Sequence, residues 1–258
     1  MREKKVKPRE RQSAIVEFLQ INGKTAVEQL AQIFKTTGTT IRKDLTALEA
    51  EKKVLRAYGS VVLVNKDEID LPEANKTNTN LEVKRRIGQK ATEFIGDGDS
   101  LLMDSGTTVL QMVPYLAKYR DLTIMTNSLH IMNALTGLER DYELLITGGT
   151  YRQKSASFHG ILAESTVEKF TFDKLFIGTN SFDLDYGLTT FNEVHGVSKS
   201  MCKAAREIIV LADSSKFQRR SPNVVCPLEK INTIVTDKKL DPAIHQALIE
   251  KNINVILV

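Results

Sequence analysis

Hydroxyl and cationic side chains gather between residues 36 and 43, and no acidic residue occurs from Phe34 to Lys43. Threonine hydroxyls and the charged ends of arginine and lysine bind phosphate oxygens and base edges, whereas a carboxylate among them would repel a polyanion. This composition favours contact with double-stranded operator DNA. The residues that we predict to make this contact are Thr36, Thr37, Gly38, Thr39, Thr40, Arg42 and Lys43.

Apolar side chains on either side of this segment predict the two short helices that must present it. Each set recurs at the i, i+3, i+4, i+7 spacing that buries one face of a helix, and a tight turn separates the sets. Two such helices are typical of a helix-turn-helix, although an ordinary helical hairpin has the same pattern. The positions predicted to be buried are Val27, Leu30, Ile33 and Phe34 on the first helix and Ile41, Leu45 and Leu48 on the second.

The flanks of these two helices complete a larger DNA-binding module. Residues 9–20 are predicted to form another amphipathic helix with Ile15, Phe18 and Leu19 inward, and residues 54–64 a short β-hairpin. Three helices followed by a hairpin make a winged helix-turn-helix. We predict that three residues of the wing touch the DNA backbone, namely Arg56, Tyr58 and Gly59.

Charge divides the chain into two parts. The first 60 residues hold 13 Lys and Arg against 7 Asp and Glu, whereas the remainder holds 23 against 25. A basic module joined to a slightly acidic one is the distribution expected of a protein that binds nucleic acid. The chain of 258 residues is long enough for two domains. We predict a DNA-binding domain over residues 1–64, a polar linker over 65–80 and a larger domain over 81–258.

Composition argues against several other classes of protein. No segment approaches the ~18 uninterrupted apolar residues that span a bilayer, and the basic start lacks the apolar stretch of a secretory signal. We therefore expect a cytoplasmic protein. Cys202 and Cys226 lack the CxxC or CxxH spacing of zinc ligands, which predicts reduced thiols and no structural metal.

From Leu81 onward, short apolar segments alternate with helical patterns. This alternation predicts an α/β fold in which helices cover both faces of a mostly parallel sheet. One helix is expected over 82–94, a second opens at the polar turn 105–108 and runs to Leu116, and a third follows Ser128 and runs to Leu135. Strands are expected over 100–104, 122–126, 142–147, 174–178, 208–212, 234–235 and 255–257.

Polar clusters follow several of these strands, at the sheet edge where such folds bind ligands. In the string Asp104, Ser105, Gly106, Thr107 and Thr108, glycine lets the backbone approach an anion and the hydroxyls and helix start donate hydrogen bonds. Phosphate or a phosphorylated sugar is the expected ligand, although a plain N-capping turn has the same composition. Asn127, Ser128, Gly148, Gly149 and Gly178 would line the same site, Lys174 and Lys216 would neutralise a phosphate, and Glu193 would accept from sugar hydroxyls. For each of these lone charged residues, an ordinary surface position is the alternative.

Across nearly its whole length, the chain resembles the DeoR family of transcriptional regulators. The resemblance rests on Val27-Glu-Gln-Leu-Ala31, Thr39-Thr-Ile-Arg-Lys-Asp-Leu45, Gly148-Gly-Thr-Tyr-Arg152 and Asp213-Ser-Ser-Lys-Phe217, besides the string at Asp104. It implies a Rossmann-like sensor domain, similar to the ribose-5-phosphate isomerase and CoA-transferase fold, and adds Arg152 to the effector site. It also implies a repressor of a sugar or polyol operon that a phosphorylated sugar releases. Longer strings such as Lys154-Ser-Ala-Ser-Phe-His-Gly160 are most similar to members that regulate glucitol (sorbitol) operons.

The implied fold also supplies an enzyme alternative, sugar-phosphate isomerisation. Family members often carry Gly-x-Asp-Gly where this chain has Gly178-Thr179-Asn180-Ser181, and the amide of Asn180 cannot act as the base that isomerisation needs. Glu193 is left as the candidate base. We therefore predict a ligand-responsive DNA-binding repressor, not an enzyme, without catalytic residues, cofactor or metal. A single DNA-binding head binds weakly, so we expect a homo-oligomer, a dimer or tetramer.

Overall fold

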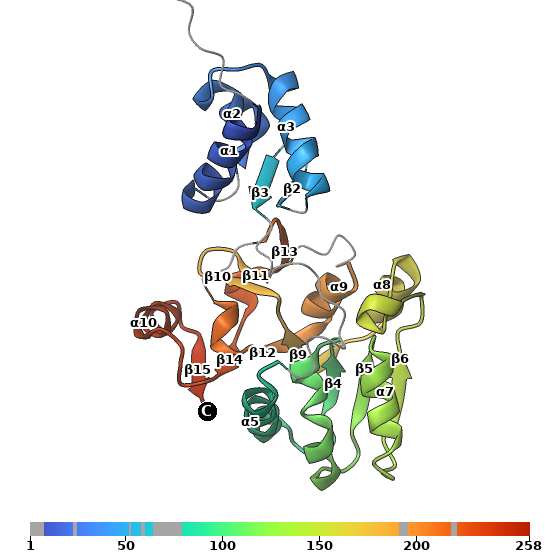
Figure 1. Cartoon of the computed structure of the whole chain (residues 1–258). Coiled ribbons are helices and arrows are strands. Elements are labelled where there is room, and N and C mark those ends of the chain that lie inside the picture. The colour runs from blue at the N-terminus through green and yellow to red at the C-terminus, as the bar shows by residue number, and fades with distance from the viewer. Residues whose placement is uncertain are drawn as a thin grey trace, which may run out of the picture. The chain divides into compact units, whose positions relative to one another are not determined.

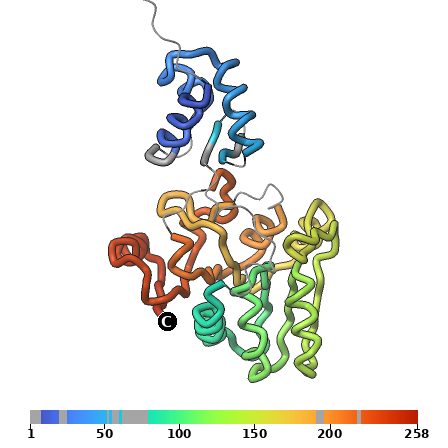
Figure 2. Tube along the Cα trace, viewed as in Figure 1, coloured from blue at the N-terminus to red at the C-terminus, as the bar shows by residue number. Residues whose placement is uncertain are grey.

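The computed structural model describes residues 8–22, 25–51, 53–57, 60–63, 79–190, 196–217 and 221–258. They belong to two compact units, one within residues 1–69 and the other within 70–258. Figure 1 draws the first unit in blue and the second from green to red, and Figure 2 follows the same trace. Of the linker predicted over 65–80, only residues 79 and 80 belong to the described residues.

The first unit is a winged helix-turn-helix, as predicted. The sheet of the wing has the order β1-β3-β2 and is antiparallel, and its short first strand was not predicted. The elements are α1 (Pro8–Asn22), β1 (Thr25–Ala26), α2 (Val27–Ile33), α3 (Gly38–Ala50), β2 (Val54–Ala57) and β3 (Ser60–Leu63).

The core of this unit contains most of the predicted apolar positions. Ile15, Leu30, Ile41 and Leu45 are fully buried between the three helices. The prediction for Ile33 is wrong, because its side chain is 42 % exposed. Ile33 is the last residue of α2, and Phe34, the C-cap residue that follows it, packs against the core.

A buried ion pair adds to this apolar core. Arg11 Nε of α1 donates to Asp44 Oδ2 of α3 at 2.6 Å, and Gln12 Nε2 donates to Asp44 Oδ1 at 3.3 Å. Asp44 is only 3 % exposed, so α3 turns this acidic side chain toward α1 and away from its outer surface.

The second unit is built on a seven-stranded parallel sheet of order β15-β14-β12-β9-β4-β5-β6, which confirms the predicted α/β class. The strands follow one another along the chain as short apolar segments, and most are buried on both faces. They are β4 (Ser100–Met103), β5 (Thr123–Thr126), β6 (Glu143–Ile146), β9 (Phe172–Gly178), β12 (Ala205–Leu211), β14 (Thr233–Thr236) and β15 (Asn254–Leu257).

Two helical layers cover this sheet. α5 (Leu81–Ala91), α6 (Thr107–Leu110) and α7 (Leu129–Thr136) share one apolar cluster with one face of the strands. α8 (Ile161–Val167), α9 (Gly196–Ala204) and α10 (Pro242–Glu250) share the other. Alternate strand residues face the two layers, which is the pattern of a sheet buried on both sides.

The helix predicted to run to Leu116 is wrong in its length. α6 ends at Leu110, and a 3₁₀-helix, η2 (Val113–Lys118), follows it. Pro114 stands at the start of η2, and proline has no backbone N–H to donate to the carbonyl of Leu110, four residues earlier. The α-helix therefore stops after one turn. A second 3₁₀ turn, η1 (Thr92–Phe94), ends the helical segment that α5 begins.

Antiparallel strands that the sequence did not predict stand above the parallel sheet. One group is the hairpin β7 (Thr150–Arg152) and β8 (Ser157–His159), and the other is a sheet of β10 (Ser181–Asp183), β11 (Gly187–Thr190) and β13 (Asn223–Cys226). The 3₁₀ turn η3 (Gln153–Ser155) connects β7 to β8, whereas η4 (Ser214–Lys216) precedes β13 and η5 (Leu228–Lys230) follows it. Strands of three or four residues carry too little periodicity to stand out in a sequence.

The remaining expectations concern the membrane and the thiols. No helix in the described part of the chain is long and apolar enough to cross a membrane. Cys202 and Cys226 are both free and buried. A hydrogen bond with Cys226, together with burial, raises the pKa of the Cys202 thiol, so this thiol stays protonated and unreactive.

Candidate functional site

The outer side of α3 carries the predicted DNA-contacting residues. Thr37, Thr39, Arg42 and Lys43 are exposed, and Thr36, Gly38 and Thr40 are half-buried. The apolar residues of the same helix face the opposite way into the core. α3 therefore presents one polar, cationic side to the solvent, and an α-helix has the diameter that fits the major groove.

Hydrogen bonds within the threonine cluster fix the start of α3. Thr37 is the N-cap, and its hydroxyl oxygen accepts from the Thr40 backbone N–H at 3.2 Å. The two hydroxyl oxygens lie 3.0 Å apart. A capping hydroxyl of this kind stabilises a helix end by about 1 kcal/mol. Thr37 and Thr40 thus hold the helix start in place, and Thr39 between them is exposed.

One carboxylate that the sequence reasoning missed lies beside this surface. Glu28 Oε1 of α2 accepts from Arg42 Nη2 at 3.1 Å, and both side chains are more than half exposed. The sequence pattern had excluded acids only along the segment itself, whereas the preceding helix brings Glu28 next to Arg42. An exposed pair of this kind is weak. Arg42 can therefore exchange its carboxylate partner for a phosphate.

The wing is described only in part. Arg56 lies in β2 with Val61 of β3 as its partner in the ladder. Its side chain, and the whole of Tyr58 and Gly59, lie outside the described residues. The predicted contact of these three residues with the DNA backbone stays a prediction.

In the second unit, the ends of β4 and β5 bring four predicted residues together. The Ser105 backbone N–H donates to Asp104 Oδ1 at 2.8 Å and to Asn127 Oδ1 at 2.9 Å. Ser198 of α9 donates its hydroxyl to Asp104 Oδ2 at 2.9 Å. Ser128, directly after Asn127, caps α7 by accepting from the Ile131 N–H. We call Asp104, Ser105, Asn127, Ser128 and Ser198 the carboxyl-end cluster.

Burial sets the electrostatics of this cluster. It raises the pKa of Asp104 to about 6, and the hydrogen bonds from Ser198 and Ser105 oppose that rise. Asn127 is fully buried. Its Nδ2 is near enough to the Asp104 carboxyl to oppose the rise too, yet no acceptor in the described residues meets it in hydrogen-bonding geometry. A buried donor without an acceptor is costly, and it is the feature that a polar ligand would correct.

The loops after β4, β6 and β9 place predicted glycines and threonines around this cluster. Thr107 and Thr108 form the first turn of α6 and are nearly buried. A Cβ at Gly106 would lie 3.9 Å from the Cα of Gly178, so these two loops touch. Gly149 has φ +103, and a Cβ there would come within 2.6 Å of the His159 carbonyl oxygen, so only glycine fits. Gly148 also has a positive φ, of +66.

The β7–β8 hairpin packs directly on the loop that follows β5. The Phe158 N–H donates to the Asn127 carbonyl at 2.8 Å, and the Leu129 N–H donates to the Ala156 carbonyl at 2.9 Å. Ser157 and His159 are buried, and Ser157 Oγ lies 2.8 Å from His159 Nε2. Arg152, opposite Ser157 in the hairpin, is half-buried. The implied site residue Arg152 thus lies on an element bonded to Asn127.

The structure does not bring every predicted residue to this edge of the sheet. Lys174 is only the third residue of β9 and therefore lies near the opposite, amino-terminal end of the strand. Its Nζ pairs with Asp99 at 2.7 Å. The expectation that Lys174 neutralises a bound phosphate is therefore wrong. Lys216 does follow the carboxyl end of β12, on η4, and Glu193 lies outside the described residues.

A buried lysine that the sequence reasoning missed lies in the first turns of α5. Lys84 is only 5 % exposed. One turn earlier, Asn80 Nδ2 donates to Asp213 Oδ1 at 3.3 Å, and Asp213 follows the carboxyl end of β12. The signal was present in the sequence, because position 84 precedes the buried Ile87 and Ala91 at helical spacing. Lys84 therefore lies one turn after a residue that bonds the segment beyond the carboxyl end of β12.

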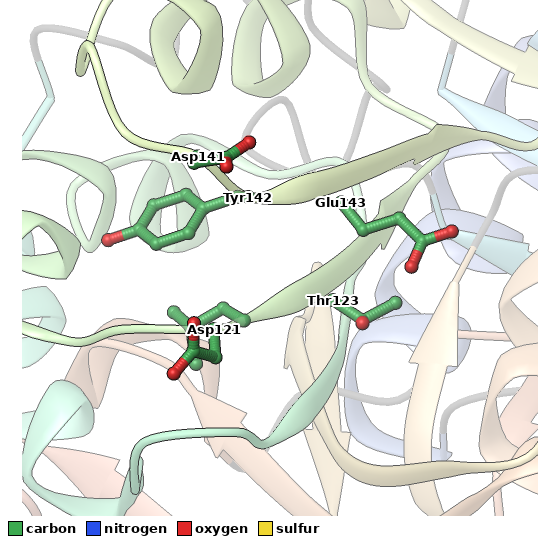
Figure 3. A pocket seen from close by; sticks show the side chains of 6 residues that line it. Asp121, Thr123, Asp141, Tyr142 and Glu143 are labelled. Atoms are coloured by element: carbon green, nitrogen blue, oxygen red, sulfur yellow. The ribbon is translucent and has the colours of Figure 1, made fainter.

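A surface hollow lies at the other end of the sheet, before β5 and β6. It has a volume near 430 Å³, and Figure 3 shows the side chains that line it. Asp121, Asp141 and Glu143 make this lining acidic, with Leu122, Thr123 and Tyr142 between them. Three carboxylates would repel a phosphate, so the hollow does not suit a phosphorylated ligand.

Comparison with known proteins gives matches to two family models and to full-length relatives. Residues 11–67 match the family model of the DeoR-like helix-turn-helix domain, and residues 79–238 match that of the DeoR C terminal sensor domain. The putative aga operon transcriptional repressor of Escherichia coli O157:H7 is 34 % identical over 252 residues, which cover 96 % of this chain and 93 % of that protein. The HTH-type transcriptional regulator GlpR of Haloferax volcanii is 34 % identical over 250 residues, which cover 96 % and 97 %.

Solved structures give a more distant likeness. Ribose 5-phosphate isomerase A from Methanocaldococcus jannaschii matches with a TM-score of 0.38 and 16 % identity, over 54 % of this chain and 55 % of that chain. The eIF2B beta subunit from Chaetomium thermophilum matches with a TM-score of 0.43 and 12 % identity, over 88 % and 63 %.

Proposed function

The chain belongs to the DeoR family of transcriptional regulators, and we propose that it represses a sugar or polyol utilisation operon until a phosphorylated sugar releases it from the operator. The observation that carries this proposal is the pairing of two features on one chain. One is an exposed, cationic α3, and the other is a buried polar cluster at the carboxyl ends of parallel strands. We further propose that the protein acts in the cytoplasm.

The DNA-binding part of the proposal rests on α3. Thr39, Arg42 and Lys43 would enter the major groove, because they point outward while the apolar side of the helix is buried. A good bidentate contact between arginine and guanine discriminates by about 1–3 kcal/mol against a wrong base. Thr36, Thr37, Gly38 and Thr40 would contact the phosphates beside the helix start, and Arg56, Tyr58 and Gly59 would contact them from the wing.

The effector part of the proposal rests on the carboxyl-end cluster and the residues around it. The N–H groups of Gly106, Thr107 and Thr108 would bind the phosphate, because the first turn of a helix leaves its N–H groups without intrahelical acceptors. Lys84 and Lys216 would balance its charge. Asp104 and Asn127 would meet the hydroxyls of the sugar, and Ser128, Gly148, Gly149, Arg152, Gly178 and Glu193 would complete the site.

Release from DNA requires the effector to distinguish two states of the protein. A ligand shifts an equilibrium only by the difference between its affinities for the two states. We propose that the state with effector bound holds its DNA-binding heads at a spacing that no longer matches the operator half-sites. Glucitol 6-phosphate is the first effector to test, because the strings at residues 36–45 and 154–160 resemble regulators of glucitol operons.

A mobility-shift assay on the DNA upstream of the gene tests the DNA-binding part. Arg42→Ala should weaken binding by roughly 5- to 150-fold, which is the 1–3 kcal/mol of one lost base contact. Arg9→Ala is the matched control, because Arg9 is an exposed arginine of the same unit that lies on α1. Equal binding by the wild type and Arg42→Ala would count against the proposed use of α3.

Titration of the bound operator with glucitol 6-phosphate tests the effector part. Unphosphorylated glucitol is the control, and other hexitol and hexose phosphates extend the series. We expect release by one phosphorylated compound and none by its unphosphorylated form. Operator affinity that is unchanged across the whole phosphorylated series would overturn the proposed effector class.

We do not assign isomerase activity to the second unit. The similar full-length proteins are named as transcriptional regulators. Both carboxylate oxygens of Asp104 already accept hydrogen bonds, one from Ser105 and one from Ser198. That arrangement orients a carboxylate as a fixed acceptor, whereas a base must meet the proton that it removes.

A further inference from the structure

Large apolar side chains are exposed along one margin of the second unit. Ile161 and Leu162, in the first turn of α8, are 81 % and 72 % exposed. Tyr151 of β7 is 46 % exposed and Ile146, at the end of β6, is 39 % exposed. Together with the half-buried Phe158 of β8, we call these five residues the hairpin patch.

The residues of the hairpin patch come from elements that touch one another. The rings of Tyr151 and Phe158 lie 5.6 Å apart across the hairpin. α8 follows β8 after a single residue, and a Cβ at Gly149, just before β7, would lie 3.1 Å from the Cβ of Ala163. The end of β6, the hairpin and the start of α8 are therefore neighbouring elements. Figure 1 shows α8 and β6 at one margin of the sheet and α10 and β15 at the other.

The size of the hairpin patch suits an interface with another protein. Its four exposed side chains present on the order of 400 Å² of apolar surface, about half of the ~800 Å² that each partner buries in a standard interface. β6 supplies further area as an edge strand of the sheet, with backbone groups on its outer side that no neighbouring strand pairs in the described residues. An open edge strand is a template for pairing with another chain.

The backbone of the same hairpin pairs with the carboxyl-end cluster, because an isolated bridge joins Ser157 to Ser128. Side chains alternate along a strand, so Ser157 and His159 point to the side of β8 that Phe158 does not. Both are buried, and the Phe158 N–H donates to the carbonyl of Asn127. Asn127 in turn accepts from the Ser105 N–H. The backbone of β8 thus contacts Asn127, a predicted effector residue, and the side chain of Phe158 on the same strand belongs to the hairpin patch.

We infer that the hairpin patch is the surface through which two copies of this chain associate, around a two-fold axis beside the edge of β6. The choice of a second copy as the partner rests on the proposed function, because one winged head reads only one operator half-site. Two-fold symmetry makes the patch meet itself, so one apolar surface is enough for both partners. An effector that moves the loop of Asn127 would move β8 with it and change how the two copies pack.

Sedimentation velocity on the full-length protein, without DNA or effector, tests the interface. We expect the wild type to have at least twice the 28.9 kDa mass of one chain. Ile161→Glu and Leu162→Glu should each halve that mass at the same concentration. Both positions are exposed in the first turn of a helix, where an acidic residue is tolerated, so the variants should keep the wild-type circular dichroism spectrum.

Ile249→Glu is the matched control. Ile249 is 47 % exposed on α10, at the margin of the sheet near β15, and receives the same substitution. We expect it to keep the wild-type mass. A monomeric wild type, an unchanged mass in both Ile161→Glu and Leu162→Glu, or an equal loss of mass in Ile249→Glu would each overturn the interface.

The failure of this inference can be told apart from failure of the proposed function. The mass measurement involves neither DNA nor effector, so it reports on the interface alone. If glucitol 6-phosphate and its relatives leave operator binding unchanged while Ile161→Glu halves the mass, the interface stands and the proposed effector is wrong. If the effector releases the wild type and Ile161→Glu keeps its mass, the repressor stands and the interface is wrong.

Discussion

The two candidate sites of this chain are built in opposite ways. On α3, the polar residues are exposed, and Arg42 and Glu28 share an ion pair in which both side chains are more than half exposed. In the carboxyl-end cluster, Asp104 is 6 % exposed, and Asn127 is fully buried. A surface that meets a long polyanion gains from long-range charge and loosely held side chains. A site for a small ligand gains from donors and acceptors that packing has already oriented.

The two units also differ in what holds them together. Among the described residues of the first unit, nine buried apolar side chains make up the core, and the Arg11–Asp44 pair lies beside them. The second unit has two apolar clusters, one on each face of its sheet. A small core leaves little stability in reserve, so the first unit depends more heavily on each buried interaction.

The largest effect is expected from Asp44→Ala, which should destabilise or unfold the first unit and leave the second unit folded. Removing one partner of a buried ion pair costs about 3–5 kcal/mol, because the other charge stays buried without it. A domain near 60 residues has a total stability of similar size. Operator binding should therefore be lost, although Asp44 faces away from the outer surface of α3. Thermal unfolding followed by circular dichroism should show the first unit melting earlier and the second unchanged.

The paired variant Arg11→Met with Asp44→Leu serves as the control for Asp44→Ala. Replacing a buried ion pair by apolar side chains of similar volume is often neutral or stabilising, so the double variant should regain the fold and operator binding. Wild-type operator binding by Asp44→Ala would mean that the ion pair contributes little. The contrast between the small and large cores would then fail.

The next effect is expected from Asp104→Asn, which should stabilise the second unit. Burial raises the pKa of Asp104 to about 6 in the folded protein, above that of the unfolded chain. The folded state therefore holds the proton more tightly, and this contribution to stability is full below pH ~4 and lost as the pH rises through 6. A shift of about two pKa units corresponds to at most about 3 kcal/mol. Asparagine cannot titrate, so the variant should be more stable than the wild type at pH 8 and nearly equal at pH 4.

Urea unfolding at the two pH values measures this difference, and effector titration on operator DNA supplies the second readout. The stabilised variant should need at least tenfold more glucitol 6-phosphate for release, because a neutral amide binds sugar hydroxyls less strongly than a carboxylate. Equal free energies of unfolding of the two proteins at pH 8 would show that burial of the ionised Asp104 carboxylate does not destabilise the second unit. Unchanged release would take Asp104 out of the proposed effector site.

The sequence predicted the α3 surface and only part of the carboxyl-end cluster, for a physical reason. A helix repeats every 3.6 residues, so the apolar positions of α3 also reveal which of its residues point outward. Asp44, three residues after Ile41, was open to the same reasoning. The cluster joins residues from distant segments, and Ser198 reaches Asp104 from 94 positions later. No local period reports such a contact.

The misplaced lysine follows from the same difference. The predicted strand 174–178 already began at Lys174, and β9 starts only two residues earlier, so both put Lys174 near the amino end of the strand. Its charge alone had suggested contact with a phosphate. Lys84 is buried at helical spacing with Ile87, although lysine side chains are mostly exposed in proteins. Periodicity was therefore a better guide to location than residue type. The short hairpin strands had no period to read.

The smallest effect is expected from Glu28→Gln, and it sharpens the account of α3 as an open, loosely paired surface. Removing the carboxylate frees Arg42 for DNA and takes away a charge that repels the phosphates. An exposed pair contributes less than about 1 kcal/mol, so operator affinity should rise by no more than about fivefold.

The control is Glu17→Gln, an exposed position on α1, which makes the same change in net charge elsewhere on the unit. Mobility shifts at low and moderate salt compare the two, since screening weakens distant charges first. An equal gain from Glu17→Gln would show that only net charge matters, and weaker binding by Glu28→Gln would show that Glu28 instead orients Arg42 for the groove.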